Sequence, residues 1–437
     1  NMNIVMLGAG YVGLVSGACF SEFGFNVTCI DTDRLKIENL KKGMIPIYEP
    51  ELENLVNKNI TSGRLKFSIE KKENIKAADA VFIAVGTPTR RGDGHADLSY
   101  VFDAAEEIAS YLDGYTVIVT KSTVPVGTSL KIKKIIQKNN SKAMFDVVSN
   151  PEFLREGSAI EDFMRPNRVI VGYENKRSKE FMARIYKPLF LFETPILYTD
   201  LKTAELIKYA SNAFLAVKIS FINQMADLCE KLDTDINDIA RGMGLDKRIG
   251  DKFLHPGPGY GGSCFPKDTL ALVQTAKQYN VSTSIVETVV EYNKKRKKSL
   301  ANKVVKLMDG KIKNKKISIL GLSFKPGTDD MRESPSLDLI PELIRLEARV
   351  SAFDPVASEE ARKFLKNLDF AKNLQDCLKD SDCVILLTEW SEFRSLSPRV
   401  LSGLMKGNCI IDFRNALDPK SFLDQEFKLY QIGRRKI

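Results

Sequence analysis

The chain has 437 residues, a length that favours two or three domains over a single hydrophobic core. Its residues are 43% apolar and 28% charged, as in a soluble globular protein, and the absence of a run of eighteen apolar residues excludes a membrane-spanning helix. The net charge of +9 is dispersed along the chain, which suits attraction of an anionic small substrate better than binding of nucleic acid.

The seven cysteines are scattered, and none belongs to a C-x-x-C pair, so we expect neither a zinc site nor a dithiol motif. This pattern, together with an N-terminus that enters a strand without a signal peptide, predicts a cytoplasmic protein. Cys29, Cys383 and Cys409 lie inside apolar runs, where the expected role is that of a buried small hydrophobe.

The first part of the chain alternates short Val/Ile-rich runs with helical patterns. Strands are predicted at residues 3–8, 26–31, 80–86, 115–122, 145–150 and 168–172, and helices at 98–111 and 128–139. Runs that are apolar throughout are typical of strands buried on both faces of a parallel sheet. We therefore predict an α/β, doubly wound, Rossmann-like domain over residues 1–199.

The first predicted strand leads into "GAGYVG", which opens an apolar helix and contains Gly8, Gly10 and Gly13. Such glycines permit a tight turn that brings a pyrophosphate against the helix N-terminus. Asp31 ends the next strand, where an acid binds ribose hydroxyls, and no arginine follows before Arg34, so NAD is favoured over NADP. A purely structural turn is the alternative.

Three further motifs follow predicted strands, at the sheet edge where doubly wound folds bind ligands. Thr87 and Thr123 lie in "VGTPTRRGDG" and "TKSTVPVGT", where turn or capping residues are the alternative. Glu152 and Glu156 in "NPEFLREG" are four residues apart and share a face if the segment is helical. Acids placed at a helix start are the alternative for this pair.

Residues 200–231 contain neither Gly nor Pro and predict one helix of roughly 45 Å, with Asp200 as its N-cap. Such a helix can join two domains and offer an apolar stripe to a second subunit. On this helix, Lys208 lies near the apolar side, four residues before Asn212. A partly desolvated lysine can act as an acid or base. The alternative is a lysine whose stem is buried while its amine reaches solvent.

The run "KKRKK" at 294–298 is interpreted as a solvated helix face.

The stretch "GPGYGGSCFPKD" places Cys264 in a glycine run, just before Lys267 and Asp268. A neighbouring cation favours the reactive thiolate, whereas Asp268 alone would disfavour it. The chain has only two histidines and neither suggests a Ser/His/Asp triad, so Cys264, Lys208 and Asp268 are the candidates for chemistry.

The last third repeats the strand pattern at 315–321, 349–355, 381–388 and 408–415. The second of these runs ends in an aspartate, as residues 26–31 do. We predict a second Rossmann-like domain at 306–437, preceded by a helical dimerisation region at 200–305 that contains the cysteine loop. Lys325 and Arg332 follow a strand and are candidates for phosphate contacts.

These motifs, with "KRIGDKFLHPGPGYGGSCFPKD" and "GLSFKPGTDDMRESPS", occur in an order that resembles the UDP-glucose/GDP-mannose dehydrogenase family, from residue 4 to about 418. The resemblance implies oxidation of UDP-glucose to UDP-glucuronate in two stages with two NAD+ molecules. It also implies a homodimer or larger oligomer. The dispersed charge and the lack of a long apolar run predict that the protein binds neither nucleic acid nor membrane.

The resemblance assigns Cys264 as the nucleophile that forms a thiohemiacetal and then a thioester, which water hydrolyses. Lys208 and Asn212 would stabilise the oxyanion, Asp268 and Thr123 would hold or activate water, and Glu152 would assist proton transfer. The implied cofactor contacts are Gly8, Gly10, Tyr11, Val12, Gly13, Asp31, Lys36, Thr87, Thr123, Glu156, Lys267 and Arg332. The implied substrate contacts are Glu152, Phe153, Leu154, Lys208, Asn212, Arg248, Phe253, Tyr260, Gly261, Phe324, Lys325 and Arg414.

Arg248 would reach the substrate of the neighbouring subunit. The sequence departs from the family pattern at "DFRN" (412–415), where "DGRN" is commoner. A relative that oxidises GDP-mannose or a UDP-N-acetylhexosamine stays open as the enzymatic alternative. A catalytically inactive nucleotide-sugar-binding protein is the alternative from another class, and the intact Cys264, Lys208 and Asp268 argue against it.

Overall fold

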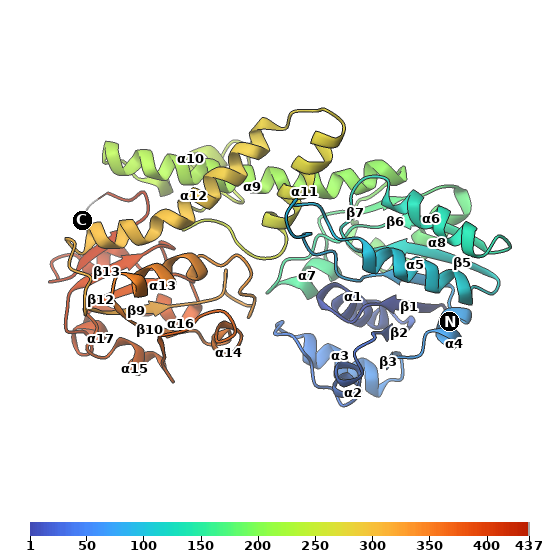
Figure 1. The fold of residues 1–437 in the computed structure, drawn as a ribbon, viewed down its shortest axis with the longest axis horizontal. Coiled ribbons are helices and arrows are strands. Elements are labelled where there is room, and N and C mark those ends of the chain that lie inside the picture. Colours follow the sequence, from blue (N-terminus) through green and yellow to red (C-terminus); the bar gives the residue numbers. More distant parts are fainter. Residues whose placement is uncertain (436–437) are drawn as a thin grey trace. The chain divides into compact units, whose positions relative to one another are not determined.

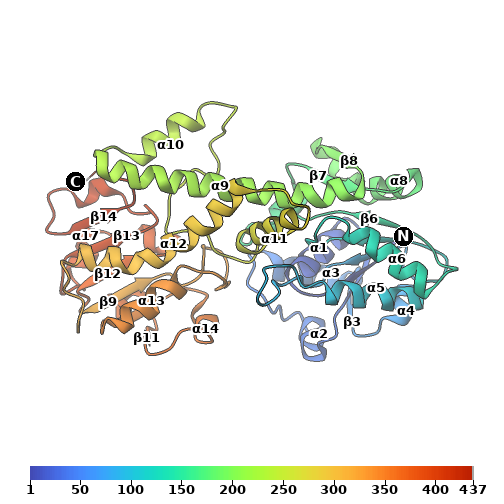
Figure 2. The ribbon, with the colours of Figure 1, turned by 45° about the horizontal axis from the view of Figure 1, so that its top comes forward.

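The structure is a computed structural model that describes residues 1–435. The chain forms two compact units, residues 1–211 with 274–281, and residues 212–273 with 282 onward. The boundary between them falls inside helix α9 (Leu201–Leu232), which Figure 2 shows as one continuous helix. Across the described residues, no helix combines the length and the apolar character that crossing a bilayer requires.

The first unit contains an eight-stranded sheet in the order β3-β2-β1-β4-β5-β6-β7-β8. Figure 1 labels β1, β2, β3, β5, β6 and β7 of this sheet. Its strands are β1 (Asn3–Leu7), β2 (Asn26–Ile30), β3 (Leu65–Ser68), β4 (Ala80–Ile83), β5 (Tyr115–Thr120), β6 (Met144–Ser149), β7 (Val169–Gly172) and β8 (Ile196–Thr199). All neighbours pair in parallel except β6 and β7. The six predicted strands are confirmed, whereas β3 and β8 were not predicted.

Helices cover both faces of this sheet, because successive residues of a strand point to opposite sides. Ile4 and Met6 of β1 pack into one apolar cluster, and Val5 and Leu7 pack into another. The helices are α1 (Tyr11–Glu22), α2 (Arg34–Lys41), α3 (Leu52–Thr61), α4 (Lys72–Lys76), α5 (Ser99–Tyr111), α6 (Thr128–Asn139), α7 (Ala159–Met164), α8 (Lys176–Ile185) and η1 (Lys187–Phe192). Helices α5 and α6 confirm the two that the sequence predicted.

The predicted long helix is also confirmed. Asp200 caps α9, since its carboxylate accepts hydrogen bonds from the amide and the hydroxyl of Thr203 at 2.9 and 2.6 Å. The helices that follow are α10 (Ile236–Gly244), α11 (Phe265–Gln278) and α12 (Ser284–Leu307).

The prediction that 294–298 forms a solvated face is wrong for two of its five residues. Arg296 pairs with Asp227 of α9 at 2.9 Å. Lys297 is buried and donates to the carbonyl and the carboxylate of Glu333 at 3.1 and 3.0 Å. These two cations therefore hold α12 against its neighbours within the second unit.

The second unit contains a six-stranded parallel sheet in the order β11-β10-β9-β12-β13-β14. Its strands are β9 (Lys316–Leu320), β10 (Arg349–Phe353), β11 (Asp369–Phe370), β12 (Cys383–Leu386), β13 (Cys409–Asp412) and β14 (Lys428–Gln431). Around them lie α13 (Ser336–Arg345), α14 (Ser358–Ala361), α15 (Leu374–Leu378), α16 (Ser391–Arg394), α17 (Pro398–Ser402) and η2 (Pro419–Phe422). This order repeats that of β1–β6, which confirms the predicted second Rossmann-like fold.

The aspartates that end β2 and β10 make equivalent contacts. Asp31 accepts a hydrogen bond from the Ala9 amide at 3.0 Å, and so fixes the turn after β1. Asp354 accepts from the amides of Leu322 and Ser323 at 2.8 and 3.1 Å, and so fixes the turn after β9. The sequence similarity between the two segments therefore reflects one shared way of anchoring a turn.

A lysine lies buried where β5 ends. Lys121 is 5% exposed and donates hydrogen bonds to Asn150 Oδ1 and the Tyr186 hydroxyl, at 3.2 and 3.3 Å. Burial lowers the pKa of Lys121 to about 8, the nearby Glu152 carboxylate opposes this change, and Lys208 adds to it.

We expect Lys121 to make the stability of the protein pH-dependent. Between pH 8 and 10.5 the unfolded chain holds a proton that the folded chain has released, so the free energy of unfolding rises with pH in this window. The rise attributable to Lys121 is up to about 3 kcal/mol. Urea unfolding across this range should show Lys121→Met lacking that rise, with exposed Lys134→Met as the control. If the free energy of unfolding rises equally with pH in wild type and in Lys121→Met, the lowered pKa of Lys121 is contradicted.

Candidate active site

The turn between β1 and α1 fits a dinucleotide. A Cβ added at Gly13 would lie 1.8 Å from the Gly8 carbonyl oxygen, so no side chain can replace this hydrogen. At Gly10 an added Cβ would meet no atom within 4 Å, which leaves space above the turn. Helix α1 begins here with no acidic residue in its first turn and no side-chain cap, as a site for phosphate groups requires.

Asp31 lies beside this turn with a carboxylate suited to ribose hydroxyls. It accepts from the amides of Ala9 and Asp33, each at 3.0 Å, and from Lys36 Nζ at 3.2 Å. Burial opposes ionisation, but these two amides and the Lys36 cation lower the pKa of Asp31 overall. A fixed negative charge at this point disfavours a 2′-phosphate.

Tyr11, a predicted cofactor contact, is held by an acid that the sequence reading missed. Its hydroxyl donates to Glu49 Oε2 at 3.2 Å, and Glu49 also accepts from the amides of Gly157 and Ala159, each at 2.8 Å. Burial, followed by the charge of Glu49, raises the pKa of Tyr11. Glu49 thereby joins the glycine turn to the segment that carries Glu156.

The two predicted threonines meet. The Thr87 hydroxyl donates to the Thr123 carbonyl at 3.0 Å, and both residues are buried. Buried Glu205 of α9 accepts hydrogen bonds from the amides of Gly127 and Ser129, each at 2.9 Å, so it caps α6 and ties the "STVPVGT" loop to α9. Glu205 was not predicted, and its sequence neighbourhood gives no sign of this distant partner.

Glu152 and Lys208 form a buried ion pair within the first unit. Lys208 Nζ lies 3.6 Å from Glu152 Oε1 and 5.0 Å from the centre of the Phe153 ring. The second carboxylate oxygen of Glu152 accepts from the Leu154 amide at 2.6 Å. Residues 151–155 are not helical, so the condition under which Glu152 and Glu156 would share a helix face is not met.

Cys264 immediately precedes α11 in the second unit. Its carbonyl accepts from the Asp268 amide at 2.8 Å, the first-turn hydrogen bond of that helix. The thiol is half-buried, and its sulfur lies 3.6 Å from the Ser263 hydroxyl. A helix N-terminus stabilises negative charge, so this position favours the thiolate.

One turn after the cysteine, buried Asp268 contacts two polar side chains, buried Asn212 and half-buried Lys267. Asn212 Nδ2 donates to Asp268 Oδ2 at 2.7 Å, and Lys267 Nζ lies 3.4 Å from Asp268 Oδ1. Asp268 is 1% exposed, and among the described residues its Oδ1 has no hydrogen-bond partner in addition to this ion pair. A buried carboxylate oxygen with unused acceptor capacity can hold a water molecule.

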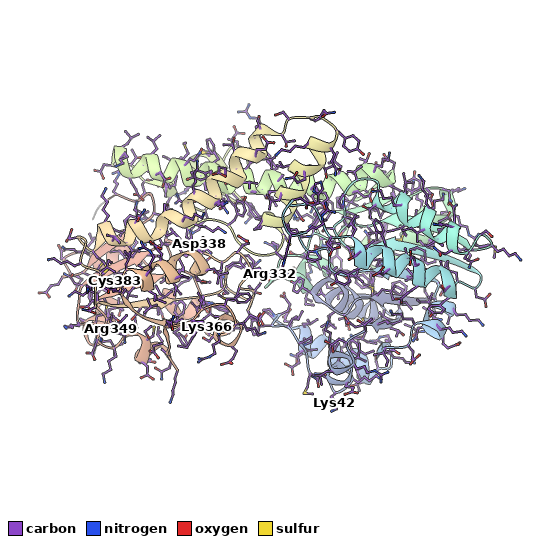
Figure 3. The ribbon with its side chains drawn as sticks, viewed as in Figure 1. Lys42, Arg332, Asp338, Arg349, Lys366 and Cys383 are labelled. Atoms are coloured by element: carbon purple, nitrogen blue, oxygen red, sulfur yellow. The ribbon has the colours of Figure 1, made fainter. Side chains whose placement is uncertain are left out.

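The glycine loop before Cys264 packs closely against Glu333 and Phe324. A Cβ at Gly261 would lie 2.5 Å from the Glu333 carbonyl oxygen, and one at Gly262 would lie 2.7 Å from the Phe324 ring. Gly262 has φ +85° and donates its amide to the Arg332 carbonyl at 2.8 Å. Arg332, labelled in Figure 3, also pairs its side chain with Asp330 at 2.8 Å.

Arg414 crosses the base of this loop. It donates to the carbonyls of Leu387 and Phe324 at 2.7 and 2.8 Å. Phe413, the departure from the family pattern, is buried in the apolar core and leaves these contacts intact. Lys325 lies 5.4 Å from the centre of the Phe324 ring, so Phe324 contacts one cation through its ring and Arg414 through its carbonyl.

Two predicted substrate residues lie in the segment after α10. The Arg248 side chain is 89% exposed and pairs with Asp246 at 2.7 Å. Phe253 has φ +62°, an unfavourable conformation for a bulky residue that is frequent at functional sites. The centre of its ring lies 6.0 Å from the centre of the Phe265 ring, and Phe265 is the first residue of α11.

The predicted residues therefore fall into contact groups within each unit. The first unit brings together Asp31 with Lys36, Thr87 with Thr123, and Glu152 with Phe153, Leu154 and Lys208. The second unit brings together Asn212 with Lys267 and Asp268, and Gly261 with Phe324 and Arg414. Lys121, at the bottom of a small cavity that Glu152 also lines, was not predicted, although a lysine directly after a buried strand was a possible signal.

Comparison with known proteins supports the predicted family along the chain. Three sequence profiles of the UDP-glucose/GDP-mannose dehydrogenase family match: the NAD binding domain at residues 2–190, the central domain at 202–295 and the UDP binding domain at 318–419. The UDP-glucose 6-dehydrogenase of Rhizobium meliloti is 53% identical over 99% of this chain and 100% of its own length.

Two solved structures cover 100% of this chain. A UDP-glucose dehydrogenase from Pyrobaculum islandicum has 36% identity and a TM-score of 0.91 over 98% of its length. A UDP-D-ManNAc dehydrogenase from Pyrococcus horikoshii has 25% identity and a TM-score of 0.86 over 100% of its length. The chain belongs to the UDP-glucose/GDP-mannose dehydrogenase family, whose cofactor is NAD.

Proposed function

We propose that this protein oxidises UDP-glucose at C6 to UDP-glucuronate through a covalent intermediate on Cys264. The observation that carries the proposal is the position of Cys264 at the N-terminus of α11, one turn before Asp268 and its partners Asn212 and Lys267. A half-buried thiol that is favoured as a thiolate and backed by a buried carboxylate suits thioester formation and hydrolysis.

The residues would act in sequence. Glu152 accepts the proton of the C6 alcohol, and the Cys264 thiolate then adds to the aldehyde carbon to form a thiohemiacetal. NAD+, when bound, accepts the hydride released in each of the two oxidations. The second oxidation leaves a thioester, and water adds to its carbonyl carbon, so the carboxylate forms and the thiol is released.

The buried charges serve the oxyanions of these steps. We assign Lys208 and Asn212 to the negative oxygen on C6, because a buried cation and a buried amide donor both stabilise developing negative charge. Asp268 and Thr123 orient the hydrolytic water, and the unused acceptor capacity of Asp268 Oδ1 supports that role. The ion pair between Lys208 and Glu152 places a cation and a carboxylate 3.6 Å apart before substrate arrives.

The cofactor and the nucleotide would be held by separate residues. We assign the cofactor to Gly8, Gly10, Tyr11, Val12, Gly13, Asp31, Lys36, Thr87, Thr123, Glu156, Lys267 and Arg332. We assign the sugar nucleotide to Phe153, Leu154, Arg248, Phe253, Tyr260, Gly261, Phe324, Lys325 and Arg414.

We divide the chain by function into an NAD-binding segment at 1–199, a dimerisation segment with the cysteine loop at 200–305, and a nucleotide-sugar-binding segment at 306–437. The relative with 53% identity carries the name UDP-glucose 6-dehydrogenase, which favours this sugar over N-acetylmannosamine.

We also propose that the protein is a homodimer that uses α9. Phe214, Phe221 and Leu228 recur every seven residues on this helix and are exposed by 64%, 44% and 49%, and Leu232 continues the row at 61%. A row of large apolar side chains at heptad spacing is typical of a helix that packs against another helix. The exposed Arg248 would then be available to the partner's substrate.

Replacement of the nucleophile should separate binding from chemistry. We expect Cys264→Ala to lower kcat for acid formation by at least about a thousandfold, because no thioester can form. Binding of NAD+ and of UDP-glucose, measured by calorimetry, should change little. Cys409→Ala, which changes the other half-buried cysteine, should retain activity. Acid production by Cys264→Ala at a normal rate would exclude the covalent mechanism.

A charge in the exposed row of α9 should break the dimer. We expect Phe221→Glu to sediment as a monomer, since the substitution places a carboxylate in an apolar interface. Phe364→Glu makes the same change at an exposed phenylalanine outside α9 and should leave the wild-type mass unchanged. A Phe221→Glu protein that keeps the mass of the wild type would refute this interface.

A further inference from the structure

Two cysteines of the second unit face one another across neighbouring strands. Cys383 begins β12, Cys409 begins β13, and the two are register partners in a parallel pair. Register partners point to the same face of a sheet, and neighbouring strands lie about 4.8 Å apart. A disulfide accepts Cα separations of about 4.4–6.8 Å, so the ladder itself brings these residues within bridging range. Figure 3 labels Cys383 in this sheet.

The two thiols also share one environment, because half-buried Cys409 packs against the apolar cluster that contains Cys383. The third cysteine of this fold, Cys377, instead donates to the backbone carbonyls of Ser351 and Ile319, at 3.6 and 3.9 Å. The pairing is therefore specific to Cys383 and Cys409. It goes beyond the role of inert buried hydrophobes that their apolar sequence context predicts.

The two members of the pair differ in access and charge. Cys383 is fully buried at 0% exposure, whereas Cys409 is half-buried at the start of its strand. The neighbouring Cys383 thiol lowers the pKa of Cys409, burial opposes this, Lys428 lowers it further and Asp309 acts against Lys428. Lys428 is the register partner of Cys409 on the other side, in β14. Because Cys409 is the more exposed of the two, it is the thiol that an outside reagent meets first.

We propose that Cys383 and Cys409 form a redox modification site that a hydroperoxide converts to a disulfide. The Cys409 thiolate attacks the terminal peroxide oxygen, the O–O bond breaks and the remaining alkoxide or hydroxide leaves, so Cys409 becomes a sulfenic acid. The Cys383 sulfur then attacks the sulfenic sulfur, the S–S bond forms, and hydroxide leaves with the Cys383 proton as water. Two electrons pass from the two sulfurs to the peroxide, and a small-molecule thiol reverses the bond by exchange.

The bond would have two consequences for this fold. Rapid capture by Cys383 keeps the sulfenic acid of Cys409 from irreversible oxidation to sulfinic acid. The cross-link also closes the chain between β12 and β13, which restricts the unfolded state and stabilises the folded one. The chemistry differs from that proposed for Cys264, which lies in another segment and forms a carbon–sulfur bond.

The test is a map of every cysteine in the full-length protein after treatment with a small excess of hydrogen peroxide. Remaining thiols are blocked with N-ethylmaleimide under denaturing conditions, the protein is digested without reductant, and peptides are identified by mass spectrometry. We expect a peptide pair linked through Cys383 and Cys409 in wild type and in the matched control Cys377→Ser. The link should disappear on treatment with dithiothreitol, and it should be absent in Cys409→Ser. Oxidised wild type should melt several degrees above its reduced form.

Cys383→Ser supplies an independent readout, because Cys409 should then accumulate as sulfenic and sulfinic acid at the same peroxide dose. The proposal is overturned if wild-type Cys409 reaches sulfinic acid while Cys383 remains available to N-ethylmaleimide. It is equally overturned if Cys409 reacts no faster than buried Cys377, or if the only linked peptides join separate molecules. The wild-type map decides among these outcomes even if a variant fails to fold.

Discussion

A carboxylate at the end of the second strand anchors the turn after the first strand in both sheets. Without a partner, the amides of that turn would be buried and unsatisfied, at a cost of about 1–3 kcal/mol each. In the second unit the carboxylate of Asp354 is used by hydrogen bonds within the protein, since it also accepts from the Trp390 ring nitrogen at 3.2 Å. In the first unit Asp31 is anchored by fewer groups and its side chain stays 14% exposed. The same contact therefore leaves a ligand site in one sheet and only a structural joint in the other.

Buried charge is the second constraint on this chain. Glu152 and Lys208 form a buried ion pair, and buried Asp268 pairs with half-buried Lys267, whereas apolar residues would pack at least as well around the buried groups. Such pairs are a poor means of stabilising a fold, but they provide preorganised charges for a reaction that generates oxyanions. Lys121 adds a buried amine next to the Glu152 segment, and it donates to the neutral side chains of Asn150 and Tyr186. We interpret this accumulation of desolvated charge as the mark of the catalytic machinery.

Local pattern was sufficient to predict much of the fold. Strands buried on both faces are continuous apolar runs in the sequence. Helix α9 corresponds to a long run without Gly or Pro that follows the N-cap residue Asp200. These elements were therefore predicted correctly. The strands β3, β8, β11 and β14 were missed because they are short or mixed in polarity, and only their neighbours in the sheet make them strands. Glu49 and Glu205 were missed for a related reason: each holds residues far away in sequence. Arg296 and Lys297 resemble solvated charges until the burial of α12 is known.

The central claim is a four-electron oxidation of one sugar nucleotide without release of the aldehyde. The most direct measurement counts NADH formed per molecule of UDP-glucose consumed, with the product identified by mass spectrometry, and repeats the count with GDP-mannose and UDP-N-acetylmannosamine. We expect two NADH per UDP-glucose, UDP-glucuronate as the product, and little reaction with the other two nucleotides. One NADH per UDP-glucose with free aldehyde, or two NADH from another sugar and none from UDP-glucose, would contradict it.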